Sequence, residues 1–325
     1  MMKRILTALV ATTALTIGST ATAASDCGKV QFGQVNWTGV SAKTETAAWM
    51  LKQLGYDTDV ITASVPIMFQ SLSSNDIDTF LGLWLPTQRS MVKKHMADGN
   101  IDIITKNLKG AKYTVGVNQE AWDAGVHSFA DLVKHADKFD NTILGIEAGN
   151  DGNQIIKQMI DDDAYGMSKF KLQPSSEAGM LTEVRRRLNH DEWAAWLAWA
   201  PHPMNINFDL KFLNGGAEYW GPNQGGATVY TLGRKGYAWQ CPNVGQFLEN
   251  YEFTVAEQSM MAGYVINDEM DYPEAGRKLI KEHPELLERW FGQGGTYQTG
   301  QVKNADGSMN AKDVVAKALG ISSEM

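Results

Sequence analysis

Short apolar segments alternate with segments of helical periodicity in the first part of this chain, and that order constrains the fold more than any other feature. Residues 31–36, 59–63 and 77–83 have the apolar character of strands, and the last of these resembles a buried parallel strand. Residues 44–54 and 66–73 carry apolar side chains at helical spacing. The alternation strand, helix, strand, helix, strand predicts an α/β fold with a doubly wound, mostly parallel sheet.

A second series of the same kind follows. Its expected strands and helices are residues 113–117, 129–135, 142–146, 154–162, 170–172, 177–189 and 194–199. After a polar, glycine-rich stretch we expect a strand at 227–237 and helices at 243–251, 256–267, 273–283 and 284–290. If Cys27 and Cys241 pair, the chain crosses twice between these series, which predicts two hinged lobes with a ligand cleft between them.

The N-terminus has the pattern of a secretory signal. Lys3 and Arg4 are followed by the apolar residues 5–17 and by the small residues 21–24, which resemble a cleavage site. The apolar stretch is too short for a membrane span. We therefore expect residues 1–24 to be a signal peptide and the mature chain to be a soluble periplasmic protein.

Charge and cysteine content narrow the classes further. The net charge of −8 argues against nucleic-acid binding, which needs a basic surface. The two cysteines, Cys27 and Cys241, favour a disulfide in an exported chain, with a pair of buried free thiols as the alternative. If they pair, the chain leaves lobe I and returns to it, with residues 25–112 and 211–325 in lobe I and residues 113–210 in lobe II. No His or further Cys stands at metal-ligand spacing.

Aromatic residues stand where predicted strands end. Trp37, Trp84 and Trp199 each end an apolar run, and Tyr113 lies at the first crossing between the lobes. Ligands of open α/β sheets bind at strand ends. Rings gathered there would form a cage for a quaternary ammonium ion, which has no hydrogen to donate and must be held by ring faces and shape. The alternative is that each ring only packs in the core. Four other tryptophans are expected on lobe surfaces or loops: Trp122, Trp220, Trp239 and Trp290.

Polar residues near these strand ends have two readings each. Asn150 precedes a helix and could cap it, bind a ligand oxygen, or do both. Thr38 and Ser41 precede the first helix, where backbone N–H groups would favour a ligand carboxylate. His202 lacks a Cys or Asp at useful spacing, so we expect a structural role for it rather than a catalytic one.

At these residues the chain resembles the periplasmic choline and glycine-betaine binding proteins of ABC importers, and it is closest to their choline-binding branch. The most specific motifs are Gly-Asn-Asp-Gly-Asn at 149–153 and Trp-Ala-Pro-His-Pro-Met-Asn at 199–205. The resemblance covers nearly the whole mature chain. It implies a two-lobed periplasmic binding protein fold of the type II-like class, with an onium ligand in the cleft.

The resemblance also implies roles for individual residues. Trp37, Trp84, Tyr113 and Trp199 fall on its cage positions, and Asn150 falls on a position that contacts the oxygen end of the ligand. Cys27 and Cys241 match a disulfide of the choline-binding branch. The implied partners are an ABC permease and its ATPase, with the receptor a monomer that needs no cofactor.

One position departs from the family pattern. Choline binders carry an acidic residue two positions after the first cage Trp, where it accepts the choline hydroxyl, but here that residue is Gly39. The change favours a zwitterion such as glycine betaine or carnitine, and we expect such a ligand to bind at least as well as choline.

Two classes of function compete at this stage. The first is a non-catalytic receptor that delivers a quaternary ammonium solute to an importer. The second is an exported enzyme that acts on a similar compound, with His202 or a cleft carboxylate as base. The sequence contains no recognisable set of nucleophile, base and orienting group, which favours the receptor.

Overall fold

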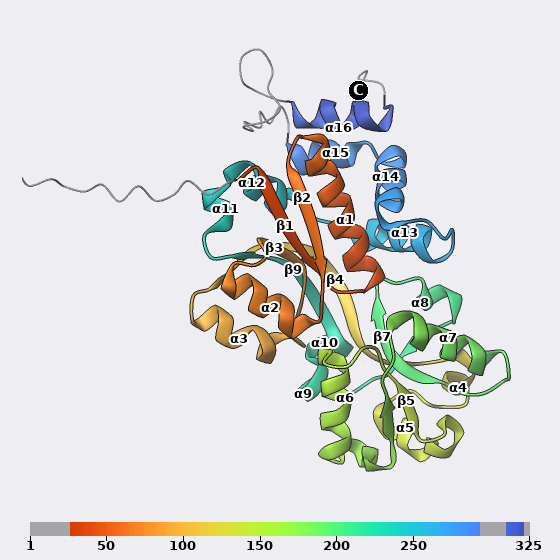
Figure 1. The fold of residues 1–325 in the computed structure, drawn as a ribbon. Coiled ribbons are helices and arrows are strands. Elements are labelled where there is room, and N and C mark those ends of the chain that lie inside the picture. The colour runs from red at the N-terminus through yellow and green to blue at the C-terminus, as the bar shows by residue number, and fades with distance from the viewer. Residues whose placement is uncertain (1–26, 293–309, 322–325) are drawn as a thin grey trace, which may run out of the picture.

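The computed structural model describes residues 27–292 and 310–321, and the predicted signal peptide lies outside these ranges (Figure 1). Nine strands of the described residues form one sheet: β1 (Lys29–Gln34), β2 (Asp57–Thr62), β3 (Thr79–Leu85), β4 (Ile101–Val117), β5 (Thr142–Leu144), β6 (Lys171–Gln173), β7 (Ala195–Ala200), β8 (Lys211–Phe212) and β9 (Gly226–Arg234). Their order is β2-β1-β3-β9-β4-β7-β5-β6, with β8 paired to β4.

The helices cover the faces of this sheet. In the first half of the chain they are α1 (Thr38–Gln53), α2 (Val65–Ser74), α3 (Arg89–Ala97), α4 (Gln119–Asp123), α5 (Phe129–Lys134) and α6 (Asp151–Asp161). The later ones are α7 (Glu177–Leu188), α8 (Met204–Asn207), α9 (Ala217–Trp220), α10 (Pro222–Gly225), α11 (Tyr237–Gln240), α12 (Pro242–Asn250), α13 (Val255–Ile266), α14 (Tyr272–Glu282), α15 (Glu285–Phe291) and α16 (Ala311–Leu319). Short 3-10 helices, η1 (Ala136–Phe139) and η2 (Ala164–Lys169), flank β5 and α6. Among the described helices, none has both the length and the apolar composition to cross a bilayer.

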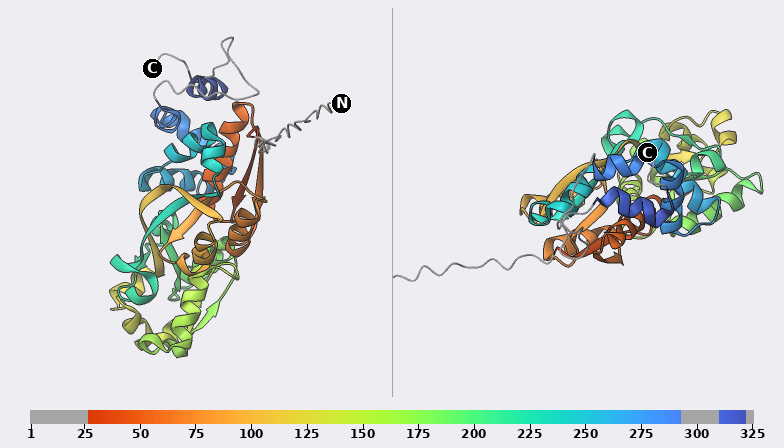
Figure 2. Two further views of the ribbon diagram at one scale, coloured as in Figure 1. Left: turned by 90° about the vertical axis from the view of Figure 1, so that its left-hand side faces the viewer. Right: turned by 90° about the horizontal axis from the view of Figure 1, so that it is seen from above.

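The sheet has two parallel parts that are joined by antiparallel strands. β1 pairs in parallel with β2 and β3, and β5 pairs in parallel with β6 and β7. Between them, the long strands β4 and β9 pair antiparallel with each other and with their outer neighbours. α1 and α13 to α16 lie on the upper part in Figure 1 and α4 to α7 on the lower part, and Figure 2 shows the same two parts from the side. The predicted two-lobed α/β fold is confirmed.

Element order agrees with the sequence-based prediction, but several limits differ. α1 begins at Thr38 rather than at residue 44, because Trp37 already has the extended backbone of an N-cap. The strand expected at 113–117 is only the end of β4, which begins at Ile101 and pairs irregularly with β9 over its first half. α3 was not predicted, since its only buried residue is Val92.

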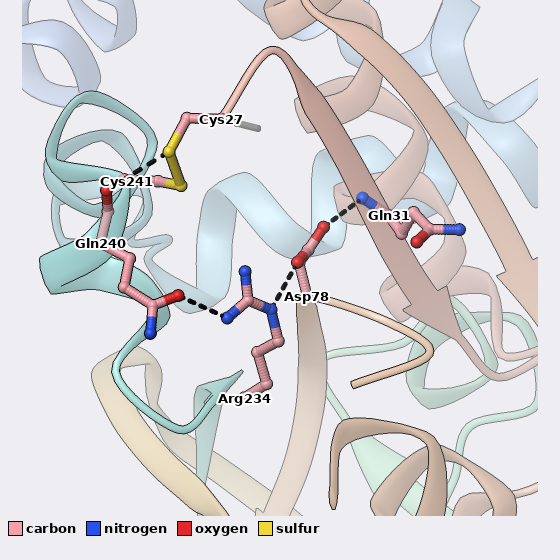
Figure 3. The surroundings of a disulfide bond; sticks show 6 residues. All are labelled: Cys27, Gln31, Asp78, Arg234, Gln240 and Cys241. Atoms are coloured by element: carbon pink, nitrogen blue, oxygen red, sulfur yellow. Dashed lines mark hydrogen bonds and ion pairs between the residues drawn. A yellow bond between two sulfur atoms is a disulfide. The ribbon is translucent and has the colours of Figure 1, made fainter. Parts of the chain in front are cut away.

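A disulfide ties the start of β1 to the loop before α12. Cys27 and Cys241 pair with a Cα–Cα distance of 5.4 Å across 214 positions of sequence. Figure 3 shows the polar contacts beside it. The carboxylate of Asp78 accepts hydrogen bonds from the backbone N–H of Gln31 at 2.8 Å and from Nε of Arg234 at 2.8 Å. The ends of β1, β3 and β9 are therefore fixed to one another at this edge of the upper part.

Candidate ligand-binding site

A pocket lies where the two parts of the sheet meet, and it encloses about 480 Å³ of empty space, part of it open to solvent. Its walls come from β3, β4, β7, α1, α13 and the loops beside them. The lining residues are Trp37, Gly39, Val40, Lys43, Trp84, Leu108, Tyr113, Ile146, Trp199, Pro201 and Gln258. All four aromatic residues of the predicted cage line this one pocket.

The aromatic end of the pocket is built around Tyr113 on β4. Its ring centroid lies 5.7 Å from that of Trp84 on β3 and 6.3 Å from that of Trp199 on β7. The Trp199 ring stands nearly perpendicular to the Tyr113 ring, at 77°. Behind Tyr113, the ring of Trp220 packs against it at 5.8 Å and has no exposed surface. The strands thus hold three rings side by side, and a fourth supports them.

Trp37 completes the aromatic end from the loop between β1 and α1. Its Nε1–H donates to a carboxylate oxygen of Glu147 at 2.9 Å, and Glu147 lies in the loop after β5. Burial raises the pKa of the Glu147 carboxyl above its usual value. This hydrogen bond joins the upper and lower parts of the molecule and fixes the plane of the indole ring.

Asn150 and Asp151 lie behind the aromatic end, at the start of α6. Asn150 Oδ1 caps the helix by accepting from the Asn153 N–H at 3.1 Å, as predicted, and it also accepts from the Tyr113 hydroxyl at 3.0 Å. Burial raises the pKa of Asp151 to about 6, and one oxygen of its carboxylate has no hydrogen-bond partner among the described residues. Burial, and then the charge of Asp151, raise the pKa of Tyr113 well above 10. Asn150 positions Tyr113 here and is not part of the pocket lining.

Glu177, in the first turn of α7, connects the two parts of the molecule beside the pocket. Its carboxylate accepts from the backbone N–H of Thr38 at 3.1 Å and from the Thr38 hydroxyl. His202 donates to the same carboxylate through Nε2 at 3.3 Å, while its Nδ1 accepts from the Met204 N–H. The predicted structural role of His202 agrees with these contacts. The N-terminus of α1, where we expected a ligand carboxylate, is already occupied by Glu177.

The other end of the pocket is polar and close to Gly39. Gln258, on α13, donates through Nε2 to the Gly39 carbonyl oxygen at 3.1 Å. A Cβ at position 39 would lie 2.9 Å from the same nitrogen, so the Gln258 amide occupies the space beside the glycine. Lys43, one turn further along α1, is buried and donates to Asn107 Oδ1 at 2.8 Å. Burial lowers the pKa of the Lys43 ammonium to about 7.

Sequence reasoning missed several residues of this site. Neither Lys43 nor Gln258 is part of a sequence pattern that marks a binding site. A helix predicted to start at Thr38 would have placed Lys43 beside the pocket. Trp220 and Trp290 were expected on surfaces or in loops, but both side chains are fully buried. Within the described ranges, no three His, Cys, Asp or Glu side chains are grouped so as to hold a metal ion.

Comparison with known proteins agrees with this geometry. Residues 28–282 match the family model OpuAC, the substrate-binding domain of an ABC-type glycine betaine transport system. The chain belongs to this family. Membership in a transport family of substrate-binding domains confirms the receptor over the exported enzyme.

Solved structures extend the similarity to most of the chain. An ABC-transporter choline binding protein in complex with choline is 39% identical, with a TM-score of 0.84 over 90% of this chain and 99% of that one. The same kind of protein in an unliganded semi-closed conformation, also 39% identical, gives a TM-score of 0.78 over 91% of this chain and 99% of that one. The glycine betaine/carnitine transport binding protein GbuC of Listeria monocytogenes is 29% identical over 55% of this chain and 59% of its own length.

Proposed function

We propose that this substrate-binding protein captures a quaternary ammonium compound in the aromatic cage of Trp37, Trp84, Tyr113 and Trp199. The observation that carries the proposal is that four aromatic side chains from four separate segments line a single pocket. The cage rings are between 5% and 9% exposed, so a cation among them is largely removed from water. Under those conditions each cation–π contact contributes about 2 kcal/mol.

Acidic groups around the cage support a cationic ligand. Asp151 lies behind Tyr113, and Glu147 accepts the hydrogen bond of Trp37. Among the described residues neither carboxylate forms an ion pair, so the negative charge of each acts on whatever occupies the rings. The relatives also favour this class, since one solved structure holds choline and a second relative is described as a glycine betaine/carnitine transport binding protein.

The same proposal includes the transport cycle. The chain is exported to the periplasm, works as a monomer, closes its two lobes on the ligand and delivers it to the permease and ATPase of an ABC importer. The sequence-based limits are residues 25–112 and 211–325 for lobe I and residues 113–210 for lobe II. Contacts of α9 with α6 favour a later second crossing, close to the start of β9.

Calorimetry on cage variants tests the proposal. Trp84→Ala and Trp199→Ala should each weaken binding of choline, glycine betaine and carnitine on the order of tenfold or more. Trp239→Ala is the matched control, because this indole is 86% exposed and lies outside the pocket. A neutral tert-butyl isostere of choline should bind more weakly than choline, since it keeps the shape and loses the charge. Unchanged affinity in both cage variants, with circular dichroism showing an intact fold, would refute the cage.

A further inference from the structure

The pocket continues beyond the aromatic cage to a second end with different chemistry. This end is lined by Gly39, Val40 and Lys43 of α1, by Leu108 of β4 and by Gln258 of α13. The Gln258 amide lies directly beside Gly39, where a Cβ would come within 2.9 Å of its nitrogen. A ligand that fills only the cage would leave Lys43 without an anionic partner among the described residues.

Lys43 is a buried ammonium group that lacks an anionic partner in the described structure. Its side chain is in the pocket wall and 2% of the residue surface is exposed. Of its three N–H donors, one is accepted by Asn107 Oδ1. Asn107 is itself held by the two hydrogen bonds that its Nδ2 donates, to the Leu81 carbonyl oxygen and the Thr231 hydroxyl. Burial is the only cause that lowers the Lys43 pKa, and no carboxylate contributes to it. A buried charge without a counter-ion is unfavourable, and an anion supplied by the ligand would offset that cost.

Gln258 presents an acceptor that has no donor. Its Nε2 is committed to the Gly39 carbonyl oxygen, which fixes the orientation of the amide. The opposite atom, Oε1, is buried and has no hydrogen-bond partner among the described residues. Because Gln258 lines the pocket, a ligand hydroxyl is a suitable donor for Oε1.

The alternative place for a ligand anion is already filled. The first N–H of α1, at Thr38, donates to the carboxylate of Glu177. A ligand carboxylate at that helix end would meet a like charge in a buried setting. Lys43 therefore stands as the cation available to an anion inside the pocket.

We propose that Lys43 and Gln258 form a second subsite that binds the carboxylate and the hydroxyl of a zwitterionic quaternary ammonium compound. This inference rests on the proposed function, because the cage must hold the trimethylammonium group. The ligand chemistry is a trimethylammonium group and a carboxylate joined by a short chain with a hydroxyl. Carnitine has this chemistry, choline lacks the carboxylate, and γ-butyrobetaine lacks the hydroxyl.

The test is calorimetric titration of carnitine, γ-butyrobetaine, choline and tetramethylammonium into the mature protein and its variants. The native protein should prefer carnitine to choline. Lys43→Met keeps the length of the side chain and removes its charge. This variant should weaken carnitine and γ-butyrobetaine by about 10- to 100-fold and leave choline and tetramethylammonium unweakened. Gln258→Leu should weaken carnitine but not γ-butyrobetaine.

Thr44→Val is the matched control for Lys43→Met. Thr44 is the next residue of α1, is fully buried, and has a hydroxyl without a partner among the described residues, but it does not line the pocket. Retained binding of tetramethylammonium shows that each variant is folded and its cage intact.

The outcomes separate this inference from the proposed function. If Trp199→Ala abolishes binding of every ligand while Lys43→Met keeps native affinity for carnitine, the second subsite is refuted and the cage stands. If Lys43→Met weakens all four ligands equally, Lys43 supports the pocket generally and the subsite is also refuted. If Trp84→Ala and Trp199→Ala both bind all four ligands normally, the proposed function itself fails.

Discussion

Closure of the lobes should depend on one carboxylate, that of Glu177. The residue is 5% exposed and lies on α7 in the lower part of the molecule. It accepts two hydrogen bonds from Thr38 in the upper part, one from the backbone N–H at 3.1 Å and one from the hydroxyl. In an open arrangement these groups would separate and bond to water. Glu177 therefore stabilises the closed state relative to the open state.

Glu177→Gln changes this contact with little change in shape. The amide keeps one acceptor oxygen but turns the other into a donor, which faces either Thr38 or the His202 Nε2–H. A hydrogen bond to a charged acceptor contributes about 1.5–3 kcal/mol. Losing one such bond across the lobes should shift closure by the same amount and weaken ligand binding by about 10- to 150-fold. Every ligand should be affected equally, because closure is common to all of them.

The assay is calorimetry with choline and carnitine, together with small-angle X-ray scattering of the unliganded protein. The matched control is Glu183→Gln, since Glu183 lies on the same helix but pairs with Arg186 and Arg187 of that helix. Glu177→Gln should weaken both ligands and expand the unliganded protein, and Glu183→Gln should do neither. Native affinity in Glu177→Gln would show that this carboxylate does not hold the lobes together.

Three further predictions concern stability. Replacing Cys27 and Cys241 together by Ser should lower the free energy of unfolding by about 2–4 kcal/mol in urea titrations, because the bridge restricts the unfolded chain; equal stability would contradict this. The pKa of Lys43 is about 7 in the folded protein and 10.5 in the unfolded chain. In the pH window between these two values the unfolded state binds more protons, so the contribution of Lys43 to stability rises with pH, by about 1.4 kcal/mol per pH unit. Urea titrations at several pH values should show a smaller slope for Lys43→Met, and equal slopes would argue against a neutral buried lysine. The pKa of Asp151 is about 6 in the folded protein, above its usual value of 3.8. In the pH window between these two values the folded state binds more protons, so the contribution of Asp151 to stability falls as the pH rises. Asp151→Asn should therefore gain stability over the native protein above that window, by about 3 kcal/mol at most, yet bind quaternary ammonium ions more weakly; a variant that loses stability at neutral pH would overturn this.

The order of strands and helices was predictable because it depends on local periodicity. The segments expected at 177–189 and 256–267 match α7 and α13 within one residue at each end. Their ends carry local signals, such as Ser176 capping α7 and Thr254 forming a capping box with Glu257. Long-range pairing was less accessible. β4 runs through both parts of the sheet, but polar residues and a glycine at 105–112 interrupt the strand pattern between its two apolar ends.

The site was predictable only in its aromatic half. Tryptophans at strand ends are unusual enough to be noticed, whereas a lysine in a helix is normally assigned to the solvated face. Lys43 is buried here, where Asn107 of β4 accepts a hydrogen bond from its ammonium group and its side chain lines the pocket. Gln258 lies 219 positions from Gly39, and no local pattern could show that its amide fills the space beside the glycine.

The charged groups near the two ends of the pocket have opposite signs, and this difference should make proton uptake depend on the ligand. Asp151 lies behind the cage, and Lys43 lies at the other end. A ligand that carries only a positive charge, such as choline, would be attracted by the Asp151 carboxylate and repelled by a protonated Lys43. Choline should therefore bind best when Lys43 is neutral. A zwitterion places its carboxylate at Lys43 and raises the pKa of that ammonium. Tyr251, whose hydroxyl donates to the Lys43 carbonyl oxygen, stays protonated, because burial raises its pKa well above 10.

Binding of carnitine above the Lys43 pKa of about 7 should therefore take up a proton, and binding of choline should not. Calorimetry in buffers with different ionisation enthalpies measures this uptake directly. Lys43→Met should abolish it, whereas Thr44→Val should keep it. Equal proton uptake for carnitine and choline in the native protein would mean that the ligand carboxylate does not reach Lys43.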